Sequence, residues 1–152
     1  MRLVHTADVH LDACFAGAGL PVRVANRRRQ SLRDVFQAIV RRAAEWPADA
    51  LLIPGDLFEH ERVTPDTAAF LKGLFDSVRP LPVVIAPGNH DPYMAGSPYI
   101  AQSWPENVVI FNRPEWIAVP LCDGRLVVHG FAFDGYEISS NPFGALAIPC
   151  DG

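Results

Sequence analysis

The sequence predicts an α/β domain built on a parallel sheet. Three observations support this fold class: strands and helices alternate over residues 3–86, the strands are continuously apolar, and a polar cluster follows each strand. The chain has 152 residues, 49% of them hydrophobic and 20% charged, which suits one globular domain with its own core.

The first predicted elements are a strand over Leu3–His5, a long connection over Thr6–Asn26 and a helix over Arg27–Trp46. Apolar residues recur every three or four positions in the helix, which predicts one buried face. That face comprises Leu32, Val35, Phe36, Ile39, Val40 and Ala43. Pro47 should end the helix, and the apolar run Ala50–Pro54 is typical of a strand buried on both sides.

The second helix should begin at Thr64-Pro65-Asp66, which combines a capping residue, a proline in the first turn and an early acid. Val83–Ala86 is the next apolar strand. Four short strands are expected after it, at residues 108–111, 116–120, 126–133 and 145–148, with a weak helical turn near 99–103.

Composition narrows the class of protein. The net charge of −4 argues against a generally basic nucleic-acid binder, although seven arginines lie between Arg23 and Arg42. We favour a solvated helix face over a phosphate-binding patch for these arginines. Three scattered cysteines outside any CxxC pattern favour a reducing, cytoplasmic location. We recognise neither a signal peptide nor an apolar run long enough for a membrane span.

Three polar clusters follow the first three strands: Asp8 with His10, then Asp56, then Asn89 with His90. The carboxyl ends of parallel strands meet at one edge of the sheet, so these clusters should converge. In extended chain, Asp8 and His10 would point the same way and hold one metal ion. The two oxygens of Asp56 could bridge two cations. Each cluster taken alone also fits an ordinary polar turn.

Gly88-Asn89-His90-Asp91 is the strongest single motif. Asn89 offers an amide oxygen to a metal, and His90 can donate a proton to a phosphate oxygen or stabilise charge there. Asp91 would orient the His90 imidazole, so His90 and Asp91 are the predicted catalytic pair. Asp8, His10, Asp56 and Asn89 are the predicted metal ligands. The alternative for the motif is a turn with a surface histidine.

These motifs resemble the first three motifs of the calcineurin-like metallophosphoesterases. The fuller strings at residues 4–12, 55–58 and 82–91 are similar to the SbcD-like exonucleases, the nuclease subunits of DNA double-strand-break repair complexes. The resemblance implies a layered β-sheet sandwich flanked by helices, of which residues 1–152 would form the N-terminal part. It also implies two divalent metal ions, most often Mn²⁺, with Mg²⁺, Fe²⁺ or Zn²⁺ as alternatives.

By the same resemblance, Asp8 and His10 bind one metal, Asp56 bridges both, Asn89 binds the second, and His90 acts beside the scissile phosphate. A bridging hydroxide would attack phosphorus. The implied substrate is DNA and the implied partner is an SMC-like ATPase, and a homodimer is compatible with the family.

The sequence departs from the family in two places. Glu59, followed by His60, stands where the nucleases often have a histidine. The later Gly-His-x-His motif does not occur, and His129 is expected to be a strand residue and not a ligand. We therefore expect an incomplete site, weakly active or inactive alone. Two alternatives remain open: hydrolysis of a small phosphodiester or phosphomonoester, and a non-catalytic interaction module.

Overall fold

The computed structural model describes residues 1–14 and 21–146. Its main sheet is parallel, with the strands in the order β1-β2-β3-β4. The strands are β1 (Leu3–His5), β2 (Ala50–Pro54), β3 (Val83–Ala86) and β4 (Val108–Ile110). The predicted α/β class is confirmed, and the strands that precede the three polar clusters are neighbours in the sheet.

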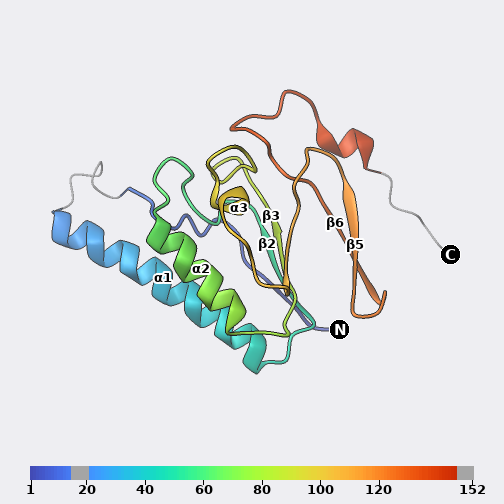
Figure 1. The fold of residues 1–152 in the computed structure, drawn as a ribbon, viewed down its shortest axis with the longest axis horizontal. Helices are drawn as coiled ribbons and strands as arrows, with labels where there is room; N and C mark the ends of the chain where they lie inside the picture. The colour runs from blue at the N-terminus through green and yellow to red at the C-terminus, as the bar shows by residue number, and fades with distance from the viewer. Residues whose placement is uncertain (15–20, 147–152) are drawn as a thin grey trace.

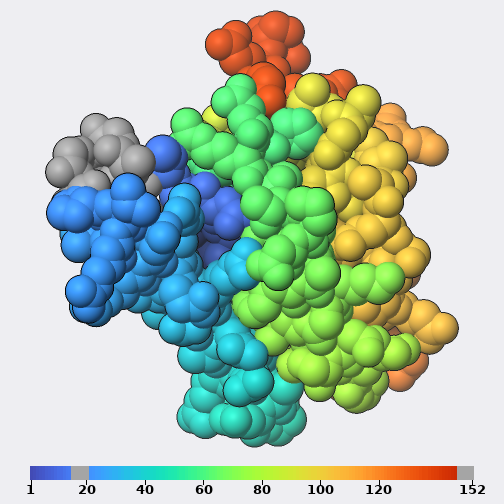
Figure 2. All heavy atoms as spheres, turned by 60° about the vertical axis from the view of Figure 1, so that its left-hand side comes forward, coloured from blue at the N-terminus to red at the C-terminus, as the bar shows by residue number. Residues whose placement is uncertain are grey.

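Helices connect the strands of this sheet: α1 (Val22–Glu45), α2 (Pro65–Asp76) and the short α3 (Pro98–Ala101). Crossovers between successive parallel strands are almost always right-handed, so helices between strands in consecutive order gather on one face. Figure 1 shows α1 and α2 packed side by side on that face of the sheet. Figure 2 views the helical face and shows residues of the N-terminal segment at the bottom of a hollow beside α1.

A hairpin of β5 (Ile117–Leu121) and β6 (Leu126–Gly130) lies on the other side of the sheet (Figure 1). The strand predicted over residues 126–133 therefore ends at Gly130. The strand predicted over 145–148 is wrong at Ala145 and Leu146, because Ala145 ends a 3-10 helix that begins at Pro142 and Leu146 caps that helix. The rest of that prediction falls on 147–148, outside the described residues.

Alternation along the strands divides the core into two layers. Leu51, Ile53 and Ile85 pack with the helices, whereas Leu52 and Val84 pack towards the hairpin. Successive side chains of a strand point to opposite faces, so both faces of β2 and β3 must be apolar. This explains why the two strands read as continuous apolar runs.

Helix α1 begins five residues before the prediction. Pro21 occupies the cap position with an extended backbone, and the helix runs from Val22 to Glu45, just before Pro47. The first turns carry little apolar periodicity, since Ala25 is the buried residue there, and this is why the start was missed. Val35 was expected in the buried face but is exposed. Among the described residues, no helix combines the length and apolarity needed to cross a membrane.

Candidate metal centre

The three polar clusters converge on loops at the carboxyl ends of β1, β2 and β3. The loop after β1 runs along the loop after β2: the His10 N–H donates to the Asp56 carbonyl at 2.9 Å, and Leu11 forms a parallel bridge with Phe58. The His60 N–H donates to the His90 carbonyl at 2.8 Å, which joins the third loop to the second. The predicted convergence is thus present, and backbone hydrogen bonds maintain it.

The loop that carries Asp8 and His10 is not extended, contrary to the prediction. Asp8, His10 and Asp56 all have positive φ, at 53°, 49° and 57°. This left-handed region is unfavourable for residues with a Cβ, and such residues concentrate at functional sites. The two side chains therefore approach each other through a tight, irregular turn and not through the period of a strand.

Two glycines allow the second and third loops to touch. A Cβ placed on Gly88 would lie 2.4 Å from Asp56 Oδ1 and 2.9 Å from the Asp56 nitrogen. Gly55 has a φ of 91°, and a Cβ there would lie 3.2 Å from Gly88 Cα. Backbone therefore packs against the Asp56 carboxylate in space that only glycine leaves free.

Asp8, His10 and Asp56 form a compact group of metal-binding atoms. His10 Nε2 lies 4.0 Å from Asp8 Oδ1 and 3.9 Å from Asp56 Oδ2, and the three atoms lie within 4.8 Å of one another. The other Asp56 oxygen accepts the His90 backbone N–H at 3.1 Å. Two carboxylates and one imidazole are donors that suit Mn²⁺, Zn²⁺ or Fe²⁺, so the group fits a divalent cation.

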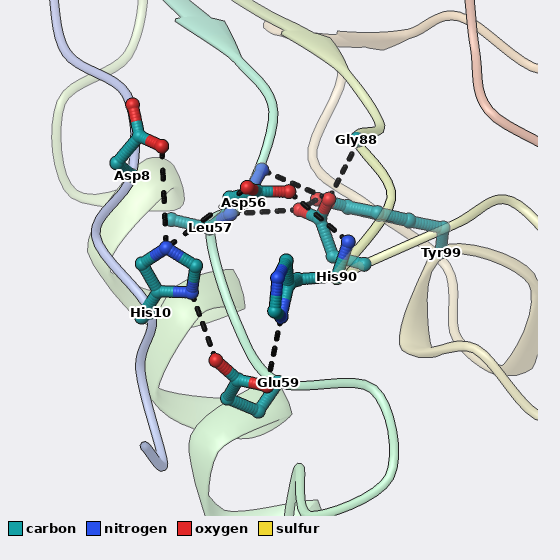
Figure 3. Close-up of polar contacts among 9 residues, drawn as sticks. Asp8, His10, Asp56, Leu57, Glu59, Gly88, His90 and Tyr99 are labelled. Atoms are coloured by element: carbon teal, nitrogen blue, oxygen red, sulfur yellow. Dashed lines mark hydrogen bonds and ion pairs between the residues drawn. The ribbon is translucent and has the colours of Figure 1, made fainter. Parts of the chain in front are cut away.

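Glu59 contacts both histidines of the site (Figure 3). Its Oε1 lies 2.8 Å from His10 Nδ1, and its Oε2 lies 3.1 Å from His90 Nδ1. Partial burial opposes ionisation of Glu59, but the hydrogen bonds to His90 and His10 outweigh it and lower the pKa of the carboxyl. The hydrogen bond that His90 donates to Glu59 in turn raises the pKa of His90.

Asp91 does not orient the His90 imidazole, so this part of the prediction is wrong. Its fully buried carboxylate accepts hydrogen bonds from the Gly88, Asp56 and Leu57 N–H groups at 2.6, 3.0 and 2.8 Å. The Tyr99 hydroxyl donates a fourth at 2.7 Å. The side chain turns inwards to tie two loops together, and Glu59 contacts His90 in its place.

Burial also shifts the pKa values of Asp91 and Tyr99. Burial raises the pKa of Asp91, although the hydrogen bonds from Tyr99 and the backbone oppose it. Burial, together with the Asp91 charge, raises the pKa of Tyr99 well above its ordinary value. Tyr99 therefore stays a hydroxyl donor, as the Asp91 carboxylate requires.

Asp12 anchors the first loop to the helices. Its Oδ2 accepts the Thr67 hydroxyl at 2.5 Å and the Thr64 N–H at 3.2 Å, at the start of α2. Arg33 of α1 hydrogen-bonds to Thr67 and pairs with Asp66 at 2.6 Å. The network fixes the loop two residues beyond His10. It also gives a structural role to Arg33, one of the seven arginines between Arg23 and Arg42.

Asn89 and His129 line one groove of about 770 Å³ between the sheet and the hairpin, together with Gly88, Trp116 and Phe131. His129 is a strand residue in β6, paired with Ala118 of β5, as the sequence predicts. His60 packs its ring near Tyr136, with centroids 6.2 Å apart. Neither His60 nor His129 joins the carboxylate–imidazole groups found among the described residues.

The sequence indicated most members of this site but not how they connect. Glu59 follows Asp56 by three positions, a spacing that brings it back towards the site only if the chain turns after Phe58. The inward direction of Asp91 had no signal in the sequence, because its contact with the Tyr99 hydroxyl is formed only in the folded chain.

A parallel sheet whose strand-end loops gather carboxylates and imidazoles is the arrangement of a metal-dependent hydrolase. The chain belongs to the calcineurin-like phosphoesterase family, whose family model matches residues 1–146.

Three similar proteins cover different shares of the chain. It is 30% identical over 151 residues to the uncharacterized metallophosphoesterase YhaO of Bacillus subtilis, covering 93% of this chain and 36% of that protein. It is 35% identical over 95 residues to the DNA double-strand break repair protein Mre11 of Halobacterium salinarum, covering 59% of this chain and 22% of that protein. For Mre11 of Methanopyrus kandleri the identity is 36% over 69 residues, covering 45% of this chain and 13% of that protein. The chain thus spans about a third or less of these relatives.

Proposed function

We propose that this chain belongs to a nuclease that hydrolyses phosphodiester bonds in DNA with the help of divalent metal ions, Mn²⁺ above all. The observation that carries the proposal is the group of Asp8, His10 and Asp56, whose binding atoms lie within 4.8 Å of one another beside His90. Residues 1–152 are assigned to the N-terminal part of its nuclease domain.

In this proposal Asp8, His10, Asp56 and Asn89 hold the metal. Asp56 suits a bridging position because its two oxygens face different neighbours, His10 on one side and the His90 N–H on the other. Asn89 lies in the third loop, one residue from both Gly88 and His90, and reaches the groove beside the site. Bound divalent cations supply charge neutralisation at the phosphate and activation of water.

His90 is the catalytic residue of the proposal. Its side chain is 45% exposed, and Nδ1 is engaged by Glu59, so Nε2 is left for substrate. Because Glu59 raises its pKa, His90 holds its proton to higher pH than a free imidazole. His90 Nε2 can then donate that proton to the oxygen that leaves phosphorus. Asp91 is reassigned from catalysis to holding the loops.

The case for DNA as the substrate rests on similarity to two proteins named for DNA double-strand break repair, over 95 and 69 residues. The case for an SMC-like ATPase partner and a homodimer rests on the family resemblance alone. The YhaO match is longer but carries no substrate in its name, so a small phosphodiester is the second candidate.

The test compares substrates. Wild-type chain with Mn²⁺ is assayed on single-stranded DNA, double-stranded DNA and a chromogenic phosphodiester, with Asp56→Asn as the background. We expect slow turnover above that background on DNA, since four protein ligands supply too few donors for two complete metal shells. Turnover of the chromogenic phosphodiester but not of DNA would indicate that the substrate is a small phosphodiester. Equal rates for wild type and Asp56→Asn on every substrate would favour a non-catalytic module.

A further inference from the structure

The arginines of α1 occupy three different parts of the helix. Arg33 is held at the first loop, where its guanidinium lies 3.7 Å from Asp12. Arg41 and Arg42 lie near the C-terminal end of the helix. The remaining four are exposed and lie together within residues 22–29, where they form what we call the α1 basic surface: Arg23, Arg27, Arg28 and Arg29.

The α1 basic surface is a local excess of positive charge on an acidic protein. The sequence has no acidic residue from position 13 to position 33, although the whole chain has a net charge of −4. Among the described residues, no carboxylate pairs with Arg23, Arg27 or Arg29. A concentration of one sign of charge attracts ligands of the opposite sign, so this surface suits a polyanion.

The surface lies at the end of α1 that faces the edge of the sheet with the metal-binding loops. Since α1 ends at Glu45, just before β2 begins, its N-terminal end points to the opposite edge of the sheet, where the strands end. Arg29 is one turn before Arg33, about 6 Å further along the helix axis, and Arg33 contacts Asp12, two residues beyond His10. In Figure 2 the first turns of α1 form one wall of the hollow that exposes the N-terminal segment.

The spacing of these arginines fits a nucleic-acid strand. From Arg23 to Arg29 the helix rises by about 9 Å. Phosphates of one strand follow one another every 3.4 Å or so along a duplex axis, so this rise corresponds to about two or three phosphates. Arg23 and Arg27 lie one turn apart, whereas Arg29 lies on the side of Arg33, so the charges extend around this end of the helix. Arginine can donate two parallel hydrogen bonds to one phosphate.

The metal-binding group does not supply this attraction. Asp8, Asp56 and Glu59 give it negative charge, and a bound divalent cation neutralises charge at the scissile phosphate. The phosphates on either side of the scissile one must be balanced by cationic groups outside the metal centre, and such contacts supply most of the non-specific affinity for DNA.

We propose that the α1 basic surface binds the phosphate backbone of the DNA strand whose scissile phosphate lies at the metal centre. The inference rests on the function proposed above and adds a binding surface outside the metal centre. For these four arginines it replaces the solvated helix face favoured from the sequence. Phosphate contacts carry no base information, so binding through this surface should not depend on base sequence.

An anionic membrane is the competing partner. Val22 and Val24 are exposed beside the arginines, at 72% and 39%, and basic residues next to apolar ones are typical of helices that lie on lipid. Ala25, however, is buried in the fold, so these turns offer two valines and no continuous apolar stripe. This limited apolar area, together with the nearby metal-binding loops, favours DNA.

The test measures DNA binding in EDTA, so that the result does not depend on hydrolysis. Fluorescence anisotropy with labelled single- and double-stranded oligonucleotides, over a range of salt concentrations, compares wild type with the triple variant Arg23→Gln, Arg27→Gln and Arg29→Gln. Arginine and glutamine have similar helix propensities, so α1 should be retained. The matched control removes three other exposed arginines and the same net charge: Arg41→Gln, Arg79→Gln and Arg125→Gln.

The triple variant should bind DNA about 10-fold more weakly, or worse, at low salt, and its slope of log affinity against log salt should be shallower by about 2–3. Arg27→Gln alone should reduce the slope by about 1, and the control should match wild type. Hydrolysis of the chromogenic phosphodiester with Mn²⁺ should not change in the triple variant, whereas hydrolysis of DNA should slow.

Equal losses in the triple variant and the control, an unchanged salt slope, or no DNA binding by wild type would each overturn the proposal. Weaker binding of the triple variant to phosphatidylserine vesicles, with unchanged binding to DNA, would assign the surface to a membrane instead. Loss of DNA binding in the triple variant, with no Mn²⁺-dependent hydrolysis of any substrate by wild type, would reject the proposed function but support this surface as a site for the DNA backbone.

Discussion

The Asp91 carboxylate accepts the backbone N–H of Asp56 at 3.0 Å, so a side chain of the third loop holds the backbone of the second. The same carboxylate also bonds to Gly88, Leu57 and Tyr99. The position of Asp56, the central residue of the site, therefore depends on a fully buried charge that touches no substrate.

Asp91→Asn should destabilise the fold. Asparagine keeps one acceptor oxygen and turns an amide donor towards N–H groups, so several charge-assisted hydrogen bonds are lost. We expect the free energy of unfolding to fall by about 3 kcal/mol, measured by urea denaturation. Asp134→Asn, a change at an exposed residue, is the control. Equal stability of the two variants would remove the structural role assigned to Asp91.

Gly88→Ala tests the close approach of the loops. The new Cβ would lie 2.4 Å from Asp56 Oδ1, so the loops must separate. We expect a loss of about 1–3 kcal/mol in stability and weaker Mn²⁺ binding. Gly73→Ala in α2 is the matched control, because a Cβ there meets nothing within 4 Å. It should stabilise the helix by about 0.5–1 kcal/mol. A fully stable Gly88→Ala that binds Mn²⁺ normally would contradict the packing described.

Glu59→Gln should lower the pKa of His90, since the hydrogen bond that His90 donates to the Glu59 carboxylate is the main cause of its rise. In wild type the raised pKa of His90 gives stability that is present at low pH and is lost as pH rises through that pKa. The lowered pKa of Glu59 gives stability that is lost as pH falls through it. The pair therefore stabilises the fold between these two pKa values.

Proton NMR titration of His90 in metal-free protein measures this effect. The Glu59→Gln curve should move to lower pH than that of wild type, while Glu61→Gln should reproduce the wild-type curve. A His90 pKa that stays in place in Glu59→Gln would show that another group sets it.

Sequence patterns predicted the features of the fold that depend on residue type and on the spacing of apolar residues. The apolar runs at 50–54 and 83–86 indicated strands buried on both faces, and the rule that strand ends meet at one edge brought Asp8, Asp56 and His90 together. These predictions do not depend on how the loops fold, and for this reason the structure confirms them.

The features of the site that the sequence did not predict depend on the conformation of its loops. The positive φ values of Asp8 and His10 have only a weak signal in residue type: aspartate and histidine adopt them more often than most residues with a Cβ, but far less often than glycine. The residue type of Asp91 does not decide whether its side chain faces His90 or the protein interior, and the contact with Tyr99 is formed only in the folded chain. Glu59 reaches both imidazoles only because the bridge between Leu11 and Phe58 aligns its loop with the first.

The central claim is that Asp8, His10 and Asp56 hold a divalent cation. Calorimetric titration with Mn²⁺ of wild type, Asp8→Asn, Asp56→Asn and the control Glu61→Gln tests it most directly. We predict saturable binding to wild type and Glu61→Gln, weak because few ligands are present, and no saturable binding to Asp8→Asn or Asp56→Asn. Equal binding to all four proteins, or none to wild type, would contradict the account.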